Sequence, residues 1–347
     1  MDTSTPSKSG TSFLKTCFNG VNALSGVGIL SIPYALSQGG WLSVLMFTTI
    51  AVICFYTGIL IQRCIDSSSL VKTYPDIGEL AFGRKGRIIV AIFMYLELYL
   101  VAIDFMILEG DNLEKLFPSV DFHVAGLKIG GKQGFVLIFS LLVLPTTWFR
   151  SLSALAGHAV FPMIYTGMSN RKMFPTVLLL CFIICTLSYG LMGVVGYLMY
   201  GESLKSQVTL NLPSRNLSSS IAIYTTLINP FTKFALLVTP IAEAIEDTLH
   251  VGKNKAVSVS IRTSLVVSTT IVALVVPYFA YAVALTGSFL SGTATMLLPC
   301  ICYLKIRSRT CRKVGFEQVV CVGIIVVGVG LVVVGTSSSL KQIIQSL

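Results

Sequence analysis

Three ionisable residues interrupt long apolar stretches of the sequence, and their positions suggest chemistry. Glu97 and Asp104 lie seven residues apart within residues 88–109, and Lys233 lies near the middle of residues 219–245. A spacing of seven places both carboxylates on one face of a helix. Ionisable groups inside a membrane are costly and commonly serve ion pathways or proton relays. We therefore expect Glu97, Asp104 and Lys233 to face the interior of a bundle as proton-coupling residues.

Each candidate also has a simpler interpretation. Glu97 would then only form a structural ion pair or a hydrogen bond to a neighbouring helix, and Asp104 would be solvated near the membrane boundary. The long stem of Lys233 would let its ammonium reach that boundary. His158 titrates near neutrality, which suggests a proton sensor, but it would serve equally as a hydrogen-bonding residue. The acidic residues that close the same helix as Lys233 are expected to be solvated: Glu243, Glu246 and Asp247.

The stretch 19–40, NGVNALSGVGILSIPYALSQGG, places helix-weakening residues inside an apolar run. Clustered glycines loosen a helix, and Pro33 removes a donor and disfavours helix just before it. One interpretation is a kinked packing helix whose glycines let neighbours approach closely. The other is a discontinuous helix whose exposed amides bind an anion such as a carboxylate at mid-membrane. The second interpretation predicts binding by Asn22, Ser25, Gly26, Val27 and Gly28.

The composition indicates an integral membrane protein. Of the 347 residues, 54% are hydrophobic and 12% are charged, whereas soluble domains carry roughly 25% charged residues. The apolar runs are continuous and do not alternate with a period of two, which favours an all-α, polytopic bundle over a barrel. Because the first residues are polar, we expect the first span itself to direct insertion. The predicted spans are 12–36, 40–62, 88–109, 134–149, 174–200, 219–245, 263–285, 288–304 and 319–340.

The basic residues orient this bundle. With the N-terminus in the cytosol, most of the 25 Lys and Arg residues fall on the cytosolic side. The net charge of +10 is thereby explained without a nucleic-acid partner. The sequon at Asn216 then lies on the opposite side, where glycosylation occurs. The cytosolic loop 63–87 contains an amphipathic piece, Tyr74–Phe82, which we expect to lie on the membrane surface.

Enzymatic motifs and metal-ligand spacings are missing from the sequence. The nine cysteines are scattered, so we predict neither a disulfide framework nor a metal site. Three histidines provide little acid–base capacity, and no nucleophile elbow, zinc-protease motif or phosphate-binding loop is present. We predict that the protein is not an enzyme and that it uses no cofactor.

Four blocks of the sequence, in the right order, resemble the amino acid/auxin permease family. NALSGVGILSIPYA followed by GGW resembles its first helix, and residues 95–118 resemble its third span and the following loop. GHAVFPMIYTGM resembles the second half of its broken sixth helix. NPFTKFALLVTPIAEAIED resembles its eighth helix. The blocks are most similar to the plant and fungal vacuolar amino acid transporter branch, which is related to vesicular inhibitory amino acid transporters.

The resemblance implies eleven helices in the broken-helix, inverted-repeat fold of leucine-type transporters. It also implies proton-coupled movement of amino acids without a bound cofactor. The substrate site of that fold lies between the first and sixth helices, which adds Gly157 and His158 to the predicted site. In related sodium-coupled transporters the region of Lys233 helps to hold a sodium ion. A fixed ammonium there would replace that ion and leave protons as the coupling ion.

The sequence departs from this pattern because nine spans are predicted instead of eleven. The fifth helix and the first half of the sixth are missing where TTWFRSLSALA runs directly into Gly157. The predicted organisation is a cytosolic tail (1–11), one transmembrane domain (12–340) and a non-cytosolic tail (341–347). Within the domain, family helices 1–4 correspond to 12–149, the remnant of helix 6 to 157–168, and helices 7–11 to 174–340.

Two functions remain open from the sequence. The first is a secondary active transporter that moves amino acids, most simply neutral ones, with protons across an endomembrane. The vacuolar or lysosomal membrane is expected, and the plasma membrane is the alternative. The second is a truncated, transport-impaired isoform with a regulatory role or none. The expected partners are an amino acid, protons and the lipid bilayer.

Overall fold

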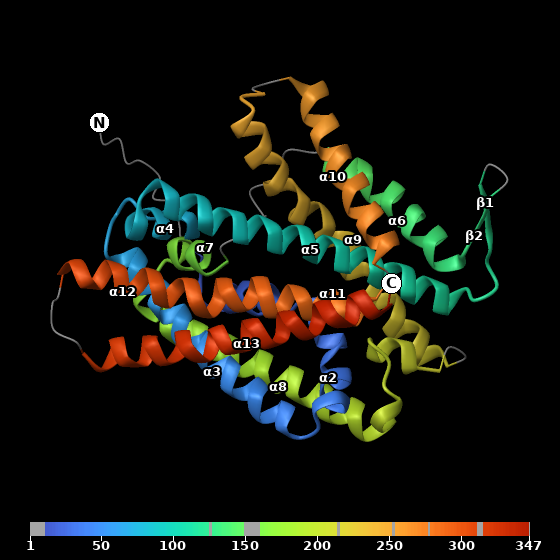
Figure 1. Ribbon diagram of the computed structural model, residues 1–347, viewed down its shortest axis with the longest axis horizontal. Helices are drawn as coiled ribbons and strands as arrows, with labels where there is room; N and C mark the ends of the chain where they lie inside the picture. Colours follow the sequence, from blue (N-terminus) through green and yellow to red (C-terminus); the bar gives the residue numbers. More distant parts are fainter. Residues whose placement is uncertain are drawn as a thin grey trace, which may run out of the picture.

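The computed structural model describes residues 11–124, 127–148, 160–213, 216–251, 254–276, 278–310 and 315–346. Most of these residues form helices, and the long helices α5 (Arg84–Leu116), Phe279–Arg309 and α13 (Phe316–Ser346) run roughly along the longest axis of the molecule (Figure 1). Seven of the described helices are long and apolar enough to cross a membrane, and Gly131–Thr147 is a shorter apolar helix. Together with the first span they correspond to the nine predicted spans.

The first span is broken, as the sequence predicts. It consists of α1 (Phe13–Leu24), a 3₁₀ turn η1 (Val27–Leu30) and α2 (Ile32–Gly39). Pro33 lies in the first turn of α2, where its missing N–H leaves no intrahelical bond unmade. The next elements follow in chain order: α3 (Leu42–Asp66), α4 (Tyr74–Phe82), α5 (Arg84–Leu116), β1 (Phe122–Val124), β2 (Leu127–Ile129) and α6 (Gly131–Thr147).

The second half of the chain is almost entirely helical. A short helix, α7 (Val160–Gly167), lies within the predicted remnant of the sixth family helix. The remaining elements are η3 (Arg171–Met173), α8 (Phe174–Tyr200), η4 (Gly201–Ser203), η5 (Val208–Asn211), α9 (Leu217–Thr248), α10 (Lys255–Val275), α11 (Phe279–Leu285), η6 (Thr286–Ser291), η7 (Thr293–Leu297), α12 (Leu298–Thr310) and α13 (Phe316–Ser346).

The turn predicted at residues 286–288 is wrong. The long apolar run does form two spans, but α10 ends at Val275 and the next helix begins at Phe279. Pro277 in the sequence gives the physical reason, because proline disfavours helix in the residue before it. The glycine- and serine-rich segment lies inside a continuous helix instead. There η6 and η7 are π-helical, with hydrogen bonds that reach five residues ahead.

The amphipathic helix α4 is packed into the bundle, so its predicted place on the membrane surface is wrong. Ile77 and Ala81 are completely buried, and the Arg309 guanidinium donates to the carbonyls of Leu80 and Ala81. The apolar face of α4 therefore covers α5 and α12 instead of lipid. Helix α4 begins with a capping box in which Thr73 and Asp76 exchange side-chain and backbone hydrogen bonds.

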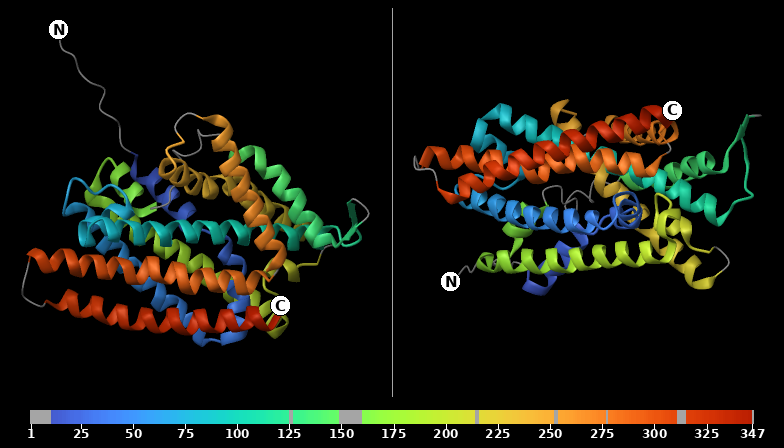
Figure 2. Two further views of the ribbon diagram at one scale, coloured as in Figure 1. Left: turned by 45° about the horizontal axis from the view of Figure 1, so that its top comes forward. Right: turned by 60° about the horizontal axis from the view of Figure 1, so that its bottom comes forward.

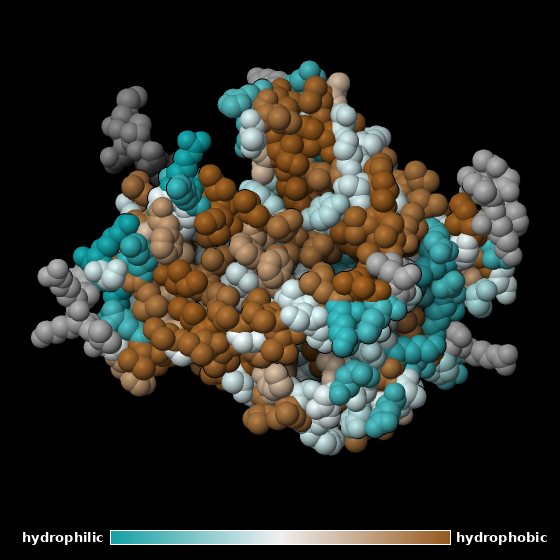
Figure 3. Space-filling model, viewed as in Figure 1, coloured by the Kyte–Doolittle hydropathy of each residue, from teal (hydrophilic) through white to brown (hydrophobic). Residues whose placement is uncertain are grey.

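The surface agrees with a membrane-spanning bundle. Hydrophobic residues cover the middle of the molecule, and hydrophilic residues gather towards its two ends (Figure 3). The hairpin of β1 and β2, which pairs Phe122 with Ile129, projects at one end (Figures 1 and 2). Two buried apolar clusters hold the helices together, one around Leu60, Cys64 and Ile77 and the other around Met106, Phe139 and Phe234.

Candidate substrate and ion-coupling site

The break in the first span is an extended stretch of two residues. Ser25 and Gly26 have ψ angles of 92° and 177°, so α1 cannot continue through them. The N–H groups of Val27 and Gly28 have no hydrogen-bond acceptor within the described part of the chain. Two adjacent unpaired amides in a membrane-spanning segment are costly unless a ligand or water satisfies them. This is the feature that the sequence predicts for a carboxylate site.

The glycines of the break do not serve close helix packing. A Cβ atom added to Gly26 or Gly28 would have no atom of the described residues within 4 Å, and neither glycine has a positive φ. Gly20, one turn and a half earlier, is different because a Cβ there would lie 2.7 Å from Cys181 Sγ. The break therefore borders open space, which favours the ligand interpretation over the packing one.

Tyr189 of α8 holds the break in place. Its hydroxyl accepts from the N–H of Gly26 at 2.9 Å and lies 3.1 Å from the carbonyl oxygen of Leu24. The ring is fixed by stacking on Phe47, with centroids 6.2 Å apart and planes at 13°. The Gly26 amide is thus already occupied, and this corrects the expectation that it binds an anion. The open amides are those of Val27 and Gly28.

Lys233 reaches the same break from α9. Its ammonium donates to the carbonyl oxygens of Asn22 and Ser25, each at 3.3 Å. These carbonyls lie at the C-terminal end of α1, where the helix dipole favours a cation. The half-buried ammonium therefore does not snorkel to the membrane boundary. Asn22 and Ser25 contribute backbone oxygens, and the Ser25 hydroxyl lies 3.9 Å from Cys185 Sγ.

Glu97 and Asp104 both face the π-helical segment of the span that begins at Phe279. The Ser291 hydroxyl donates to Glu97 Oε1 at 2.5 Å. Asp104 lies beside Thr286, whose hydroxyl donates to the Ala282 carbonyl at 3.0 Å. The two carboxylates therefore lie on one inward face of α5, as predicted. Solvation of Asp104 near the membrane boundary is wrong, since only 3% of its surface is exposed and Oδ1 is buried without a partner among the described residues.

Two buried acidic residues were not recognised from the sequence. Glu109, also on α5, is 3% exposed, and its Oε1 has no partner among the described residues. Glu246 was expected to be solvated, but it pairs with the fully buried Arg262 at 3.0 Å. Arg262 also donates to the carbonyl of Thr147 at 2.8 Å, which joins α6, α9 and α10. Glu246 and Arg262 lie on different helices, α9 and α10, so residue spacing within one helix could not reveal their contact.

Three predicted residues lie at the margins of this description. Gly157 and His158 lie outside the described residues, so their predicted contribution stays a prediction. Asn216 is exposed and precedes α9 directly as its N-cap residue. Its glycosylation also stays a prediction.

Comparison with known proteins gives the family. The family described as transmembrane amino acid transporter protein matches residues 9–157 and 154–341. The chain belongs to this family of amino acid/auxin permeases. It is 44% identical to Amino acid transporter AVT1J of Arabidopsis thaliana over 388 residues, which cover 96% of this chain and 92% of the relative. It is also 42% identical to Amino acid transporter AVT1I of the same plant, over 97% of this chain and 96% of the relative.

A more distant relative of this permease is the Vesicular GABA transporter of Caenorhabditis elegans, at 22% identity over 97% of this chain and 81% of the relative. These relatives carry transporter names, and the family is one of transporters and not of enzymes. The predicted resemblance to the vacuolar branch and to vesicular inhibitory transporters is confirmed.

The family match is interrupted where the sequence analysis expects missing helices. The alignment with AVT1J has 388 positions against the 347 residues of this permease, so at least 41 positions face a gap in this chain. The two parts of the family match meet at residues 154–157. The two parts of the family match thus meet at the junction of TTWFRSLSALA and Gly157, and the loss of helices there stays a prediction.

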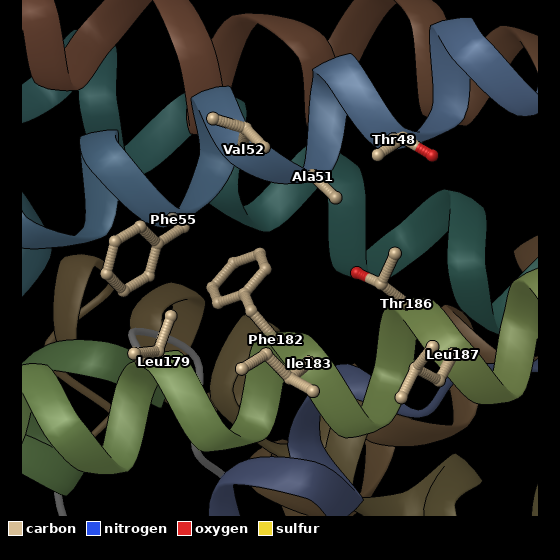
Figure 4. Close-up of a pocket in the computed structure, with 9 residues that line it drawn as sticks. All are labelled: Thr48, Ala51, Val52, Phe55, Leu179, Phe182, Ile183, Thr186 and Leu187. Carbon is tan, nitrogen blue, oxygen red and sulfur yellow. The ribbon is translucent and has the colours of Figure 1, made fainter.

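The permease also carries an apolar groove that differs from this site. Side chains of α3 and α8 point towards one another across it (Figure 4). Its volume is about 240 Å³, and its lining is apolar apart from the hydroxyls of Thr48 and Thr186. A zwitterion would lose its hydration there without gaining partners. The groove suits lipid chains better than an amino acid.

Proposed function

We propose that this permease moves neutral amino acids across an endomembrane, coupled to protons. The observation that carries the proposal is the break in the first span, where the unpaired amides of Val27 and Gly28 lie close in sequence to carbonyls held by Lys233. The amides supply donors for a substrate carboxylate. The open space beside Gly26 and Gly28 supplies room for it.

The position of Lys233 favours protons over a free cation as the coupling ion. In a site of this kind a free cation would need the oxygens of Asn22 and Ser25 as ligands, and the ammonium occupies both. A fixed positive charge neutralises the end of α1 without leaving the protein. Coupling then falls to groups that change charge, and Glu97 and Asp104 are carboxylates buried in the bundle at the π-helical segment.

The charges around the break favour neutral amino acids as substrates. Among the described residues, Lys233 is the charged side chain that contacts the break, and its ammonium is directed to the backbone. A neutral amino acid would bind through its own ammonium and carboxylate groups. The charged side chain of an acidic or basic amino acid would need a further partner of opposite charge in the protein. The vacuolar membrane is proposed because the relatives of highest identity given above belong to the AVT1 group.

The second candidate is a transport-impaired isoform, and one observation favours it. Gly26 and Gly28 border open space on the first span, which faces the sixth helix in the family fold. The two parts of the family match meet at residues 154–157, where the sequence predicts that the first half of the sixth helix is missing. A binding site formed by the first helix without a complete sixth helix would bind its substrate weakly. Such a chain would still insert in the membrane and would compete with complete transporters for partners.

Reconstitution in proteoliposomes tests both candidates. We would measure uptake of radiolabelled neutral amino acids under an imposed pH gradient, with a protonophore as the control for coupling. The matched comparison is the same chain with the segment that AVT1J carries at the interruption inserted after residue 156. Protonophore-sensitive uptake by the native chain supports proton-coupled transport. Uptake by the extended chain alone refutes it and selects the impaired isoform.

A further inference from the structure

The sequence leaves the carbonyl of Ala294 without a hydrogen-bond donor in its own helix. In the π-helical register of η7 a carbonyl pairs with the N–H five residues ahead, which for Ala294 belongs to Pro299. Proline has no N–H, so this bond cannot form. A buried carbonyl without a donor costs about 1–3 kcal/mol in a protein. Another donor must therefore satisfy Ala294 if the π register is to be stable.

Tyr74 of α4 supplies that donor. Its hydroxyl lies 2.6 Å from the Ala294 carbonyl oxygen, and the side chain is 7% exposed. Burial raises the pKa of Tyr74 well above its ordinary value, with smaller contributions from neighbouring groups that include Glu97. The phenol therefore keeps its proton and remains a donor. Because helix α4 is packed on the bundle, the position of the Tyr74 hydroxyl is fixed by the surrounding core.

The same π-helical segment presents a hydroxyl to Glu97. Ser291 lies three residues before Ala294, and its hydroxyl donates to Glu97 Oε1. The Ser291 carbonyl accepts from the Thr295 hydroxyl at 2.6 Å, which ties the two turns together. A change from the π to the α register would rotate Ser291 relative to Ala294 and to α5.

We propose that Tyr74 is a positioning residue for the proton site at Glu97, because it holds the π register that places the Ser291 hydroxyl on that carboxylate. The inference rests on the proposed function for its role in transport, but the two hydrogen bonds, from Tyr74 to Ala294 and from Ser291 to Glu97, do not depend on it. A cytosolic-side helix thereby sets the proton affinity of a group inside the membrane.

Among the described residues, few other titratable groups face this segment. Asp104 lies beside Thr286, five residues before Ser291, and the Cys54 thiol lies 3.9 Å from Thr295 Oγ1. Residues of α13 that pack on the segment are Gly328, Val332 and Gly335, which do not titrate. The remaining titratable neighbours of Tyr74 are thiols of α3 and α12: Cys64, Cys300 and Cys302.

The test is an infrared titration of Glu97 in purified protein, with the carboxylic-acid band assigned by its loss in Glu97→Gln. Donation from Ser291 stabilises the charged carboxylate, so losing it makes Glu97 bind its proton at higher pH. We expect Tyr74→Phe and Ser291→Ala each to raise the midpoint by about one pH unit. The double variant should give no larger shift than Ser291→Ala. Tyr99→Phe, which removes a phenol that bonds Ser268 instead, should not shift it.

A rescue variant keeps the inference falsifiable. Pro299→Ala supplies an N–H five residues after Ala294, so Tyr74→Phe should lose its effect in that background. An unchanged midpoint in Tyr74→Phe, in protein that elutes and unfolds like wild type, overturns the inference. An equal shift with and without Pro299→Ala overturns it as well. If wild-type uptake does not depend on pH while these midpoints shift as expected, the proposed function fails and the positioning role stands.

Discussion

Lys233 Nζ lies 3.3 Å from the carbonyl oxygen of Ser25, and this contact joins α9 to the point where the first span comes apart. The relationship couples two features that the sequence offers separately, an ammonium within an apolar run and a glycine-rich break. In the structure they form one site.

Replacing Lys233 should remove the fixed charge at the break. In Lys233→Ala the carbonyls of Asn22 and Ser25 lose their donor, so α1 loses a charge-assisted hydrogen bond worth about 1.5–3 kcal/mol. We expect pH-driven uptake to fall by about tenfold or more. Lys205→Met, at an exposed position, is the matched control and should transport normally. Intact pH-driven uptake by Lys233→Ala would refute the coupling role.

Replacing Gly26 or Gly28 with alanine should weaken substrate binding without lowering the stability of the fold. Each new Cβ meets no atom within 4 Å in the part of the chain that the structure describes, so thermal stability in detergent should stay the same or rise slightly. Substrate affinity, measured by scintillation proximity binding, should fall because the methyl group stands beside the open amides. Gly20→Ala is the contrasting variant, since its Cβ would meet Cys181 Sγ at 2.7 Å and should lower stability by about 1–3 kcal/mol. Wild-type affinity in both break variants would rule out this backbone as the carboxylate site.

The buried pair of Arg262 and Glu246 should be a main determinant of stability. Arg262→Met leaves Glu246 buried without its cation, which typically costs about 3–5 kcal/mol. Arg87→Met, at an exposed ion pair, should cost less than about 1 kcal/mol. Unfolding titrations in mixed micelles measure both. The double variant Arg262→Met/Glu246→Leu should recover much of the loss, and a double variant as unstable as the single one would contradict the ion-pair explanation.

Asp76 should make the stability of α4 depend on pH. Burial alone would raise the pKa of Asp76, but hydrogen bonds from the Thr73 side chain, the Thr73 N–H and the Lys72 N–H outweigh it and lower the pKa. A carboxyl with a lowered pKa in the folded state stabilises that state above its unfolded value, near 3.8, and the stabilisation is lost as the pH falls through the lower, folded value. Hydrogen exchange of α4 should therefore quicken, relative to the intrinsic rate, on acidification below that range.

The matched variant is Asp76→Asn, which should lose the acid-dependent step and start from a lower protection of α4 at neutral pH. A capping interaction of this kind contributes about 0.5–2 kcal/mol. The same acid-dependent step in Asp76→Asn would show that another group is responsible.

The sequence by itself determined the membrane class, the break in the first span and the inward face shared by Glu97 and Asp104. These are consequences of hydropathy, of the helical period and of the backbone limits of glycine and proline, all of which act over a few residues. Only the tertiary structure decided which groups meet: Lys233 with the Ser25 carbonyl, Tyr189 with Gly26, Arg262 with Glu246 and Tyr74 with Ala294. Each of these pairs is separated by many residues or by a helix reversal, and its partner is chosen by the packing of whole helices. The same packing buried Asp104 away from solvent, turned α4 inward and carried the helix through residues 286–288, where local propensity alone favoured a turn.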